Sequence, residues 1–486
     1  MDNLTSLFLS QSYQDTWDDY NRSITSETFP VWDYIILTAS DDNQAEGYYK
    51  QIEERKDFLP SRTHFAVIPD EGGVRVGSGG ATLSVLKYIY EREGRFDGIR
   101  TLVIHSGGDS KRVPTYSALG KLFSPVPHKL PNGRSSTLFD EFIIAMASVP
   151  PRIREGMLLL SGDVLLLFNP LQIDFSGKGA AAISFKEQVE TGKNHGVFLN
   201  GEKGHVRKFL HKQTVETLTK MGAVNENNCV DIDTGAIIFS PELLEQLYSL
   251  IDTQEKYKKY VNNTVRLSLY GDFLYPLAED STLERFYTEK PEGEFCAELQ
   301  EARTIVWEKL CPYRMKLLRL APAKFIHFGT TTEILSLMST GVHAYDALSW
   351  RPRINSSIQG ETAGYNSVLS SHATIGANCY LEVSFVHRQA TIGNNVLLSY
   401  IDIHDETVPD NVVLHGLKQK TENLYVVFMI FTIILRKQSF LAGNFQRYRK
   451  RLTYRNPNCG IPKTILYGWQ TFILNVILSK KQLVPH

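Results

Sequence analysis

The sequence lacks the features that mark several specialised classes of protein. Its five cysteines are scattered, odd in number and never arranged as Cys-x-x-Cys, so we expect neither a disulfide framework nor a cysteine-rich zinc site. This cysteine usage predicts a reducing, cytoplasmic location. The 52 basic and 53 acidic side chains leave no excess of positive charge for holding nucleic acid. The first 20 residues contain no apolar run typical of secretory signals. The apolar stretch 424–435 is well short of the roughly 20 residues that a membrane-spanning helix needs. We therefore expect neither nucleic acid nor a membrane as a partner.

The composition is that of a globular chain with several domains. The 486 residues are 42% apolar, and at roughly 100–200 residues per domain they allow about two to four domains. We predict an N-terminal segment over 1–30, an α/β domain over 31–345, a short repeat domain over 346–417 and a basic, apolar tail over 418–486. The last boundary rests on charge, because the tail holds twelve basic residues and one acidic residue. One hypothesis is that residues from about 422 onward are an out-of-frame or truncated remnant without a packed fold.

The first 340 residues alternate between predicted strands and predicted helices. Two segments have helical apolar spacing, 82–92 and 137–146. The runs that predict buried strands are 34–39, 102–105, 157–161, 179–185 and 235–239. This alternation predicts a Rossmann-like α/β fold with a mostly parallel sheet covered on both faces. In such sheets ligands bind outside the carboxyl ends of the strands.

A repeat follows the α/β region. Thr374-Ile-Gly-Ala-Asn378 recurs seventeen residues later as Thr391-Ile-Gly-Asn-Asn395, and apolar residues return at steps of about six. Three short strands of this length make one triangular coil of a parallel β-helix. An ordinary β-meander would instead show simple alternation. We predict a short left-handed parallel β-helix of about three coils.

The strongest chemical signal lies after the strand 102–105. There the sequence runs His105-Ser-Gly-Gly-Asp-Ser-Lys-Arg-Val-Pro114, and Gly120-Lys121 follows. Gly107 and Gly108 let backbone N–H groups approach an anion closely, while Arg112 offers a bidentate fork to phosphate and Lys121 a compact charge. The alternative is a tight turn with solvated charges. No G-x-x-x-x-G-K-[ST] occurs, which excludes a P-loop NTPase.

Two further segments are candidates for the same site. The glycines Gly77, Gly79 and Gly80 precede a predicted helix and would receive the base or ribose of a nucleotide, or form only a flexible turn. Asp163 follows a buried strand as Ser161-Gly-Asp163, where its carboxylate would hold Mg²⁺ or cap the next segment. His195, Lys212 and Asp272 also stand near strand ends or turns, and each of them alone is more often structural.

Taken in order, these segments resemble the sugar nucleotidyltransferases, and within them the L-fucose-1-phosphate guanylyltransferases (GDP-fucose pyrophosphorylases), including the transferase half of the bifunctional fucokinase enzymes. The resemblance covers about residues 30–417. It rests on the two glycine runs, on Ser117-Ala-Leu-Gly-Lys121, Ser161-Gly-Asp163, His195-Gly-Val-Phe198, Gly271-Asp-Phe273 and Phe328-Gly-Thr330.

The resemblance implies that L-fucose 1-phosphate and GTP give GDP-L-fucose and pyrophosphate. It assigns Gly107 and Gly108 to the triphosphate, Arg112 and Lys121 to catalysis, and Asp163 to Mg²⁺. Lys212 would hold the phosphate of the sugar, and His195 or Asp272 its hydroxyls.

The sequence departs from the family pattern at two places. Many relatives carry an Asp-x-Gly segment with a second metal carboxylate where this chain has His327, which leaves Asp272 as a substitute. The sugar-phosphate lysine stands in His211-Lys-Gln213 and not in the more usual Glu-Lys-Pro. No second glycine-rich nucleotide loop follows, so fucokinase activity is not expected.

Three alternative functions stay open. One is uridylyl or guanylyl transfer to another sugar 1-phosphate. Another is acyl transfer by a β-helix, with His372, His387 or His404 between coils. The last is a regulator that binds sugar nucleotides without catalysis, although Arg112, Lys121 and Asp163 are all present.

Overall fold

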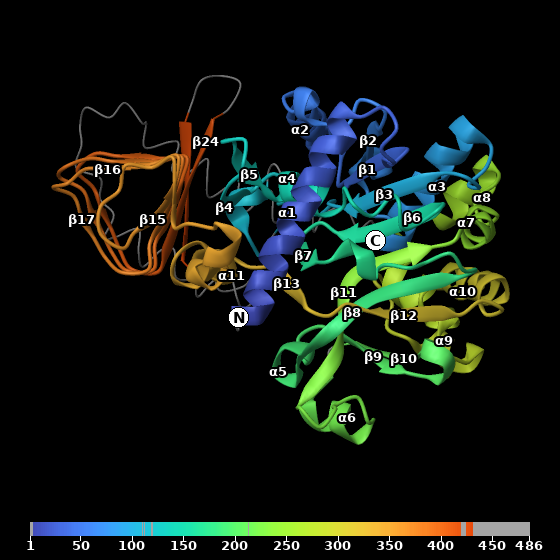
Figure 1. Ribbon diagram of the computed structural model, residues 1–486. Coiled ribbons are helices and arrows are strands. Elements are labelled where there is room, and N and C mark those ends of the chain that lie inside the picture. The colour runs from blue at the N-terminus through green and yellow to red at the C-terminus, as the bar shows by residue number, and fades with distance from the viewer. Residues whose placement is uncertain are drawn as a thin grey trace. The chain divides into compact units, whose positions relative to one another are not determined.

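The computed structural model describes residues 3–108, 110, 112–117, 120–211, 213–418 and 424–430, and of residues 417–418 and 424–430 only the backbone (Figure 1). These residues all belong to one compact unit, which ends at Ile434. The predicted tail 418–486 lies largely outside the described residues.

A nine-stranded sheet forms the centre of the α/β part. Its strands are β1 (Tyr34–Ala39), β2 (His64–Pro69), β3 (Arg100–His105), β6 (Gly156–Ser161), β8 (Ala180–Gln188), β9 (Gly196–Asn200), β10 (Val206–His211), β11 (Cys229–Phe239) and β12 (Met315–Arg319). The order is β10-β9-β11-β6-β3-β1-β2, and β8 pairs with both β11 and β12. Only β10 and β11 run against the other strands. The predicted mixed α/β fold with a mostly parallel sheet is thus confirmed, and all five predicted strands are present.

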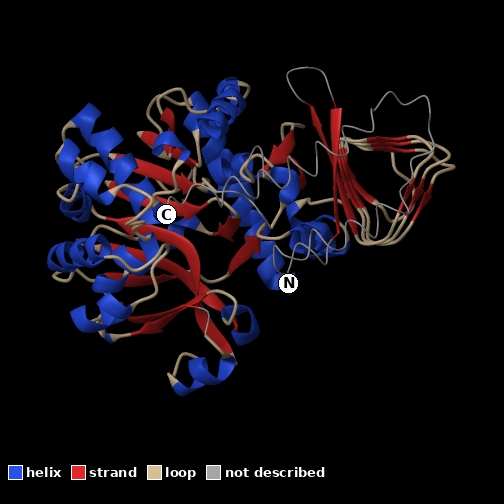
Figure 2. Ribbon diagram, turned by 180° about the vertical axis from the view of Figure 1, so that it is seen from behind, coloured by secondary structure: helices blue, strands red, loops and turns tan. Residues whose placement is uncertain are grey.

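Both faces of this sheet are buried, which explains its continuous apolar strands. In β1, Ile35 and Leu37 pack into one core while Tyr34 and Ile36 pack into the other. Successive side chains of a strand point to opposite faces, so a strand between two cores needs apolar residues at every position. Figure 2 shows helices on both sides of the red strands.

The helices that cover the sheet begin and end with identifiable signals. The two predicted ones are α3 (Gly77–Glu93), which ends at Gly94 in the left-handed conformation, and α4 (Leu138–Ala145), which begins with a capping box at Thr137. The others are α1 (Asn3–Thr25), α2 (Asp42–Glu53), α5 (Val189–Gly192), α6 (Val215–Lys220), α7 (Pro241–Tyr248), α8 (Gln254–Tyr260), α9 (Leu283–Thr288), α10 (Ala297–Leu310) and α11 (Thr331–Met338). Of the helices among the described residues, none combines the length and the apolarity needed to cross a membrane.

The predicted N-terminal segment 1–30 is mostly the helix α1. Its buried residues include Leu9, Trp17 and Tyr20, which belong to the same core as β1 and α4. The hydroxyl of Tyr13 also donates to Glu141 of α4 at 3.1 Å. The segment therefore packs as part of the α/β core.

Residues 353–418 form three parallel ladders of short strands, which we call the ladder stack (orange in Figure 1). One ladder holds β14 (Arg353–Ile354), β15 (Ala363–Tyr365), β18 (Tyr380–Glu382), β21 (Leu397–Ser399) and β24 (Val412–Lys418). The second holds β16 (Val368–Leu369), β19 (Phe385–Val386) and β22 (Asp402–Ile403), and the third β17 (Thr374–Ile375), β20 (Thr391–Ile392) and β23 (Thr407–Val408). A separate apolar core lies among them and includes Leu381, Leu398 and Leu414.

The sequence repeat marks strands that are stacked in register. Thr374 lies opposite Thr391, and both strands lead into an asparagine in the left-handed region, Asn378 at φ 55° and Asn395 at φ 53°. Asparagine tolerates this conformation better than most residues, so its recurrence fixes the turn of each coil. After β24, β25 (Leu424–Ile430) returns antiparallel beside it.

Two minor antiparallel pairs complete the strands, β13 (Ala323–His327) with β7 (Val164–Phe168), and β4 (Pro125–Lys129) with β5 (Ser135–Thr137). The first pair matters for the site, because β7 begins directly after Asp163 and β13 ends at His327.

Candidate active site

The carboxyl ends of three neighbouring parallel strands meet at one edge of the central sheet. β3 and β6 pair so that His105 lies opposite Ser161, and β1 lies on the other side of β3. The backbone N–H groups of Ser106 and Gly107 both point to Thr38 Oγ1 of β1, at 3.2 and 3.3 Å. The loops after β3 and β6 therefore lie side by side, as the parallel sheet predicts.

Gly162 allows the two loops to come this close. Its N–H donates to His105 O at 3.0 Å, and a Cβ at this position would lie 2.8 Å from the same oxygen. On the other loop, Gly108 has a φ of 141°, which favours glycine, and open space where a Cβ would stand. The turn thus presents bare backbone on its open side, as an anion-binding turn requires.

Lys121 and Asp163 form an ion pair at this edge. Lys121 Nζ lies 3.1 Å from Asp163 Oδ2 and 3.2 Å from Gly329 O, and its side chain is 12% exposed. Ser161 Oγ donates to the other carboxylate oxygen at 2.8 Å. Burial alone would raise the pKa of Asp163, but the charges of Lys121 and His327 and these hydrogen bonds hold it below its ordinary value. Asp163 is therefore an ionised carboxylate at neutral pH.

Two histidines, His327 and His195, lie next to the Lys121–Asp163 ion pair. His327 Nε2 lies 3.8 Å from Asp163 Oδ2, and its Nδ1 lies 3.1 Å from Glu333 Oε1. The ring of His195 stands edge-on to that of His327, with centroids 5.5 Å apart. The structure thus brings His195 to the site from a position between α5 and β9.

Arg112 stands at the same edge with its side chain exposed. Thr331 holds its backbone, because Thr331 N and Oγ1 donate to Arg112 O at 2.9 and 3.0 Å. The same segment binds Asp163, since Phe328 N donates to Asp163 O at 2.8 Å. Among the described residues, none forms a hydrogen bond or ion pair with the Arg112 guanidinium. That cation is therefore available to a ligand.

Contacts on two sides hold the loop between Arg112 and Lys121 in place. Gly120 has a φ of 78°, and a Cβ there would lie 2.0 Å from the hydroxyl oxygen of Tyr48, so the position requires glycine. Tyr116 donates its hydroxyl to the buried carboxylate of Glu382 in β18. The ladder stack therefore helps to hold the loop that carries Arg112 and Lys121.

The first glycine run packs against the protein, and the role of Gly77, Gly79 and Gly80 in holding the nucleotide stays a prediction. The N–H groups of Gly79 and Gly80 donate to Leu267 O at 2.7 and 3.3 Å, and a Cβ at Gly77 would lie 2.4 Å from that oxygen. Ser78 N and Oγ donate to Glu292 at 3.1 and 3.0 Å. Protein groups already cap the start of α3, and close backbone approach explains the glycines.

Asp272 needs a correction, because its carboxylate is fully buried and partnered by protein. Arg303 Nε donates to Asp272 Oδ1 at 2.8 Å, and Ser268 N donates to Oδ2 at 2.6 Å. Both side chains are at most 1% exposed. Asp272 therefore fixes the 268–273 turn and is not placed to bind sugar hydroxyls. Lys212, the predicted phosphate ligand of the sugar, lies outside the described residues.

A second carboxylate at the site, that of Asp233 in β11, was not identified from the sequence. Its Oδ1 accepts the N–H of Gly235 at 2.9 Å, and burial raises its pKa to about 6. The hydroxyl of Tyr270 donates to Gly235 O, and the pKa of Tyr270 is raised first by burial and then by Asp233 and Asp163 together. The carboxylates of Asp233 and Asp163 therefore both lie near the Tyr270 hydroxyl. The signal was an acid followed by Thr-Gly inside an apolar strand, where the pairing of β11 with β8 shifts register.

The oxygen donors at this edge suit Mg²⁺. Asp163 supplies an ionised carboxylate, Ser161 a hydroxyl beside it, and Asp233 a second carboxyl whose raised pKa a bound cation would lower. The donor set therefore fits a hard cation that is shared with substrate phosphates, and the predicted role of Asp163 remains a proposal.

Comparison with known proteins gives a consistent result. The family model of the fucose pyrophosphorylase domain matches residues 94–455. Fucose-1-phosphate guanylyltransferase of Mus musculus is 26% identical over 426 residues, which cover 80% of this chain and 72% of that protein. The Homo sapiens protein of the same name is 26% identical over 76% of this chain and 66% of its own length. Bifunctional fucokinase/GDP-fucose pyrophosphorylase of Arabidopsis thaliana is 28% identical over 67% of this chain, but that match covers only 33% of the longer protein.

Among solved structures, the crystal structure of HddC from Yersinia pseudotuberculosis matches 66% of this chain and 81% of its own, with 12% identity and a TM-score of 0.30. That likeness is too low to carry an argument. The family match, in contrast, spans most of the chain and includes the loops after β3 and β6. On this ground the chain belongs to the fucose pyrophosphorylase family.

Proposed function

We propose that this protein is a fucose-1-phosphate guanylyltransferase, which makes GDP-L-fucose and pyrophosphate from L-fucose 1-phosphate and GTP. The observation that carries the proposal is the meeting of Arg112, Lys121 and Asp163 beside the Gly107-Gly108 turn. A bare backbone turn, two cations and an ionised carboxylate are what the transfer of a nucleotide between two polyanions requires. The names of the relatives support fucose 1-phosphate as the acceptor and a guanylyl group as the group transferred, and GTP as its donor is part of the proposal.

The reaction depends on the positioning of its two substrates and on the neutralisation of their charge, and it needs no covalent intermediate with the enzyme. A phosphate oxygen of the sugar phosphate attacks the α-phosphorus of GTP, and the bond to the β-phosphate breaks as pyrophosphate leaves. Holding both substrates converts this attack into a step within one complex, and fixed positive groups stabilise the charge that builds up in the transition state.

Each side chain then has a distinct part. The N–H group of Gly108 binds the triphosphate, and Gly107, whose own N–H donates to Thr38 Oγ1, keeps the turn bare so that the phosphates can approach it. The free guanidinium of Arg112 bridges the phosphate oxygens. Lys121 stabilises charge on the α-phosphoryl group, and Asp163 keeps the ammonium group oriented through their 3.1 Å contact. Gly329 and Thr331, from one segment, hold the Lys121 ammonium group and the Arg112 backbone before substrate arrives.

Asp163 and Asp233 would hold Mg²⁺, which when bound neutralises phosphate charge. On the sugar side, the contact between the His195 and His327 rings supports His195 as the ligand of substrate hydroxyls, and Lys212 stays the predicted ligand of the sugar phosphate. The cytoplasmic location likewise stays a prediction.

We also propose that the ladder stack is the expected short left-handed parallel β-helix, with domain boundaries near 345 and 417. Three ladders whose strands recur every 16 or 17 residues support this reading. Its contribution to the reaction is mechanical, since Glu382 holds Tyr116 in the loop between the two cations.

A pyrophosphate-release assay tests the proposal. Each of the four nucleoside triphosphates is combined with L-fucose 1-phosphate and several other sugar 1-phosphates, with and without Mg²⁺. We expect turnover that is fastest with GTP and L-fucose 1-phosphate and that depends on Mg²⁺. Faster turnover with UTP, or with another sugar 1-phosphate, would reassign the substrates, and no turnover with any pair would reject the function.

A further inference from the structure

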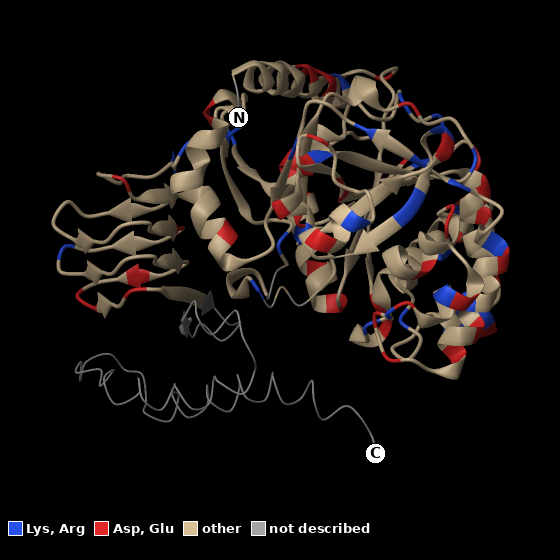
Figure 3. Cartoon of the chain, turned by 90° about the horizontal axis from the view of Figure 1, so that it is seen from below, with Lys and Arg blue, Asp and Glu red and all other residues tan. Residues whose placement is uncertain are grey.

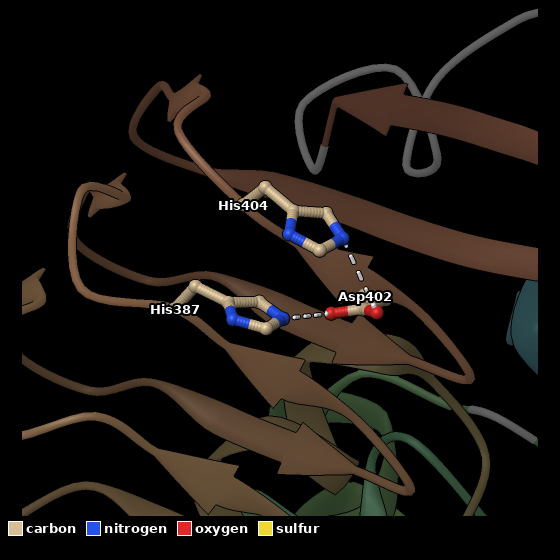
Figure 4. Close-up of side chains that lie close together, drawn as sticks. All are labelled: His387, Asp402 and His404. Carbon is tan, nitrogen blue, oxygen red and sulfur yellow. Dashed lines mark hydrogen bonds and ion pairs between the residues drawn. The ribbon is translucent and has the colours of Figure 1, made fainter. Parts of the chain in front are cut away.

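A group of metal-ligating side chains lies in the ladder stack and has no part in the reaction proposed above. His387, Asp402 and His404 come together on the outward face of the second ladder, as Figure 4 shows. Among the described residues, this is the one place where three or more His, Cys, Asp or Glu side chains bring ligand atoms within 4.8 Å of one another. The side chains are 37, 55 and 62% exposed, so solvent and ions reach them freely.

The sequence repeat explains why they meet. β19 and β22 pair with Phe385 opposite Asp402 and Val386 opposite Ile403, which places the next residues, His387 and His404, one above the other. Their rings are stacked with centroids 4.0 Å apart and planes 16° apart. Neighbouring strands are about 4.8 Å apart, so residues at equivalent positions of two coils must touch.

Asp402 joins the two rings on the same face. It stands two residues before His404, and alternate residues of a strand share a face. His387 Nε2 lies 2.8 Å from Asp402 Oδ1, and His404 Nε2 lies 3.4 Å from Asp402 Oδ2. Both imidazoles thus turn the same nitrogen toward one carboxylate.

This spacing is close to that of a metal site. Bonds of about 2.0–2.2 Å from a zinc ion to nitrogen and oxygen put ligand atoms roughly 3–3.5 Å apart. The separations of 2.8 and 3.4 Å from the two imidazoles to the Asp402 carboxylate are close to these values, and all the ligand atoms lie within 4.8 Å of one another. Imidazole nitrogens favour transition metals over Mg²⁺, and here two imidazoles and one carboxylate lie together, whereas the donors assigned to Mg²⁺ in the candidate active site are carboxylate and hydroxyl oxygens.

The surrounding charge also favours a cation. Asp405 and Glu406 follow directly, and a Glu406 carboxylate oxygen accepts the backbone N–H of His404 at 2.8 Å. Arg388 is the one neighbouring cation in sequence. The three carboxylates, those of Asp402, Asp405 and Glu406, therefore outnumber this cation.

We propose that His387, His404 and Asp402 form a binding site for a divalent transition-metal ion, with Zn²⁺ as the natural candidate, whose remaining positions are filled by water. The ion links two adjacent coils, because His387 belongs to one and Asp402 and His404 to the next. Because the ion binds the folded chain, it stabilises the ladder stack by an amount that rises with the logarithm of its concentration over its Kd. The site is independent of nucleotide transfer.

Calorimetric titration of the metal-free full chain with Zn²⁺ tests the site. We expect one ion per chain, and His387→Gln, Asp402→Asn and His404→Gln should each weaken binding by about tenfold or more. His343→Gln is the matched control, because His343 is also exposed and lies 3.4 Å from a single carboxylate, that of Asp346, without a second histidine. That variant should bind as the parent chain does.

Two further outcomes decide the matter. Co²⁺ in place of Zn²⁺ should give a visible absorption spectrum of low-coordinate cobalt that is weaker in His404→Gln at the same cobalt concentration. Zn²⁺ should raise the midpoint of thermal unfolding more in the parent chain than in any of the three variants. Absence of binding in the parent chain, or equal affinity in the parent and the three variants, would overturn the proposal. Because no readout is turnover, failure of the guanylyltransferase assay would leave this result unaffected.

Discussion

Asp163 in the α/β part and Glu382 in the ladder stack are both largely buried carboxylates, and the molecule holds them in opposite states. The pKa of Asp163 is lowered despite its burial because Lys121 lies 3.1 Å away. Burial raises the pKa of Glu382 to about 7, because its partners are the hydroxyls of Tyr116 and Ser399 and not a cation. The difference shows that the nearest charge, more than burial, decides whether a buried acid is ionised.

The two regions differ in charge more widely. Figure 3 shows basic and acidic residues interspersed over the α/β part, whereas few lie on the ladder stack. The stack builds its polar contacts by repetition instead: Asn378 donates to Asn395 at 2.8 Å, and Asn395 to Asn411 at 3.0 Å. Glu382 stands in a similar row, between Tyr365 and Ser399, with His415 beyond. Burial lowers the pKa of His415 to about 4, so this histidine brings no positive charge to Glu382 at neutral pH.

The largest effect is expected where a buried acid loses the cation that pairs with it. Arg303→Met leaves Asp272 fully buried and without its ion-pair partner, and should lower the free energy of unfolding by about 3–5 kcal/mol. The double variant Arg303→Met with Asp272→Asn should be more stable than the single one, since no isolated charge remains. Denaturant unfolding of the four chains of this cycle measures both values. Purely additive losses would show that the pairing of charges is not what matters here.

A second test of the comparison removes Lys121, the cation that lies beside Asp163. Lys121→Ala should lower the rate of nucleotide transfer about a hundred- to thousandfold, roughly 2–4 kcal/mol of barrier, because one charged contact to the transition state is lost. The pKa of Asp163 should also rise, which moves the acid limb of the residual rate to higher pH. Steady-state rates across pH measure both effects. Lys178→Ala, at a lysine whose side chain is 80% exposed, is the control and should keep the parent rate and profile.

The smallest effect concerns Glu382 and pH. Folded Glu382 keeps its proton up to about pH 7, whereas the unfolded chain releases it near the ordinary value of 4.5, so the folded state binds more protons in between. The stability of the parent chain should therefore fall as pH rises through this range. Relative to Glu382→Gln, which has no such proton, we expect a loss of about 2 kcal/mol between pH 5.5 and 7.5.

Unfolding curves at both pH values measure this difference. Glu361→Gln, at an exposed glutamate of the same stack, should follow the parent chain at both values. Parallel stability curves for the parent chain and Glu382→Gln would contradict the protonated state of the buried acid.

The sequence was informative where a function depends on neighbouring residues in the chain. Apolar runs marked the strands, and the segments His105–Lys121 and Ser161–Asp163 stood directly after two of them. Because carboxyl ends of parallel strands share one edge of a sheet, these loops were expected to meet, and they do. The 17-residue repeat likewise predicted in-register stacking.

Sequence reasoning was less informative where a role depends on a distant partner. Gly77, Gly79 and Gly80 have the pattern of an anion-binding helix start, yet Leu267 accepts two of their N–H groups. Asp272 follows a glycine in an aromatic turn, yet Arg303 neutralises it. Asp233 lies in a strand whose register shift alone places it beside Tyr270 and the site. None of these partners is within 30 residues of the residue it explains.

By itself, the sequence determined which backbone forms strands, where glycine permits a turn, and which charged residues follow those turns, because such preferences are set by each residue and its immediate neighbours. Only the tertiary structure decided which of these groups face a ligand and which are occupied by protein. It also decided which buried acids are charged, since that depends on the distance to a cation brought from another part of the chain. The joining of Tyr116 to Glu382, and of His387 to His404 through Asp402, follows from the way the coils stack and pack.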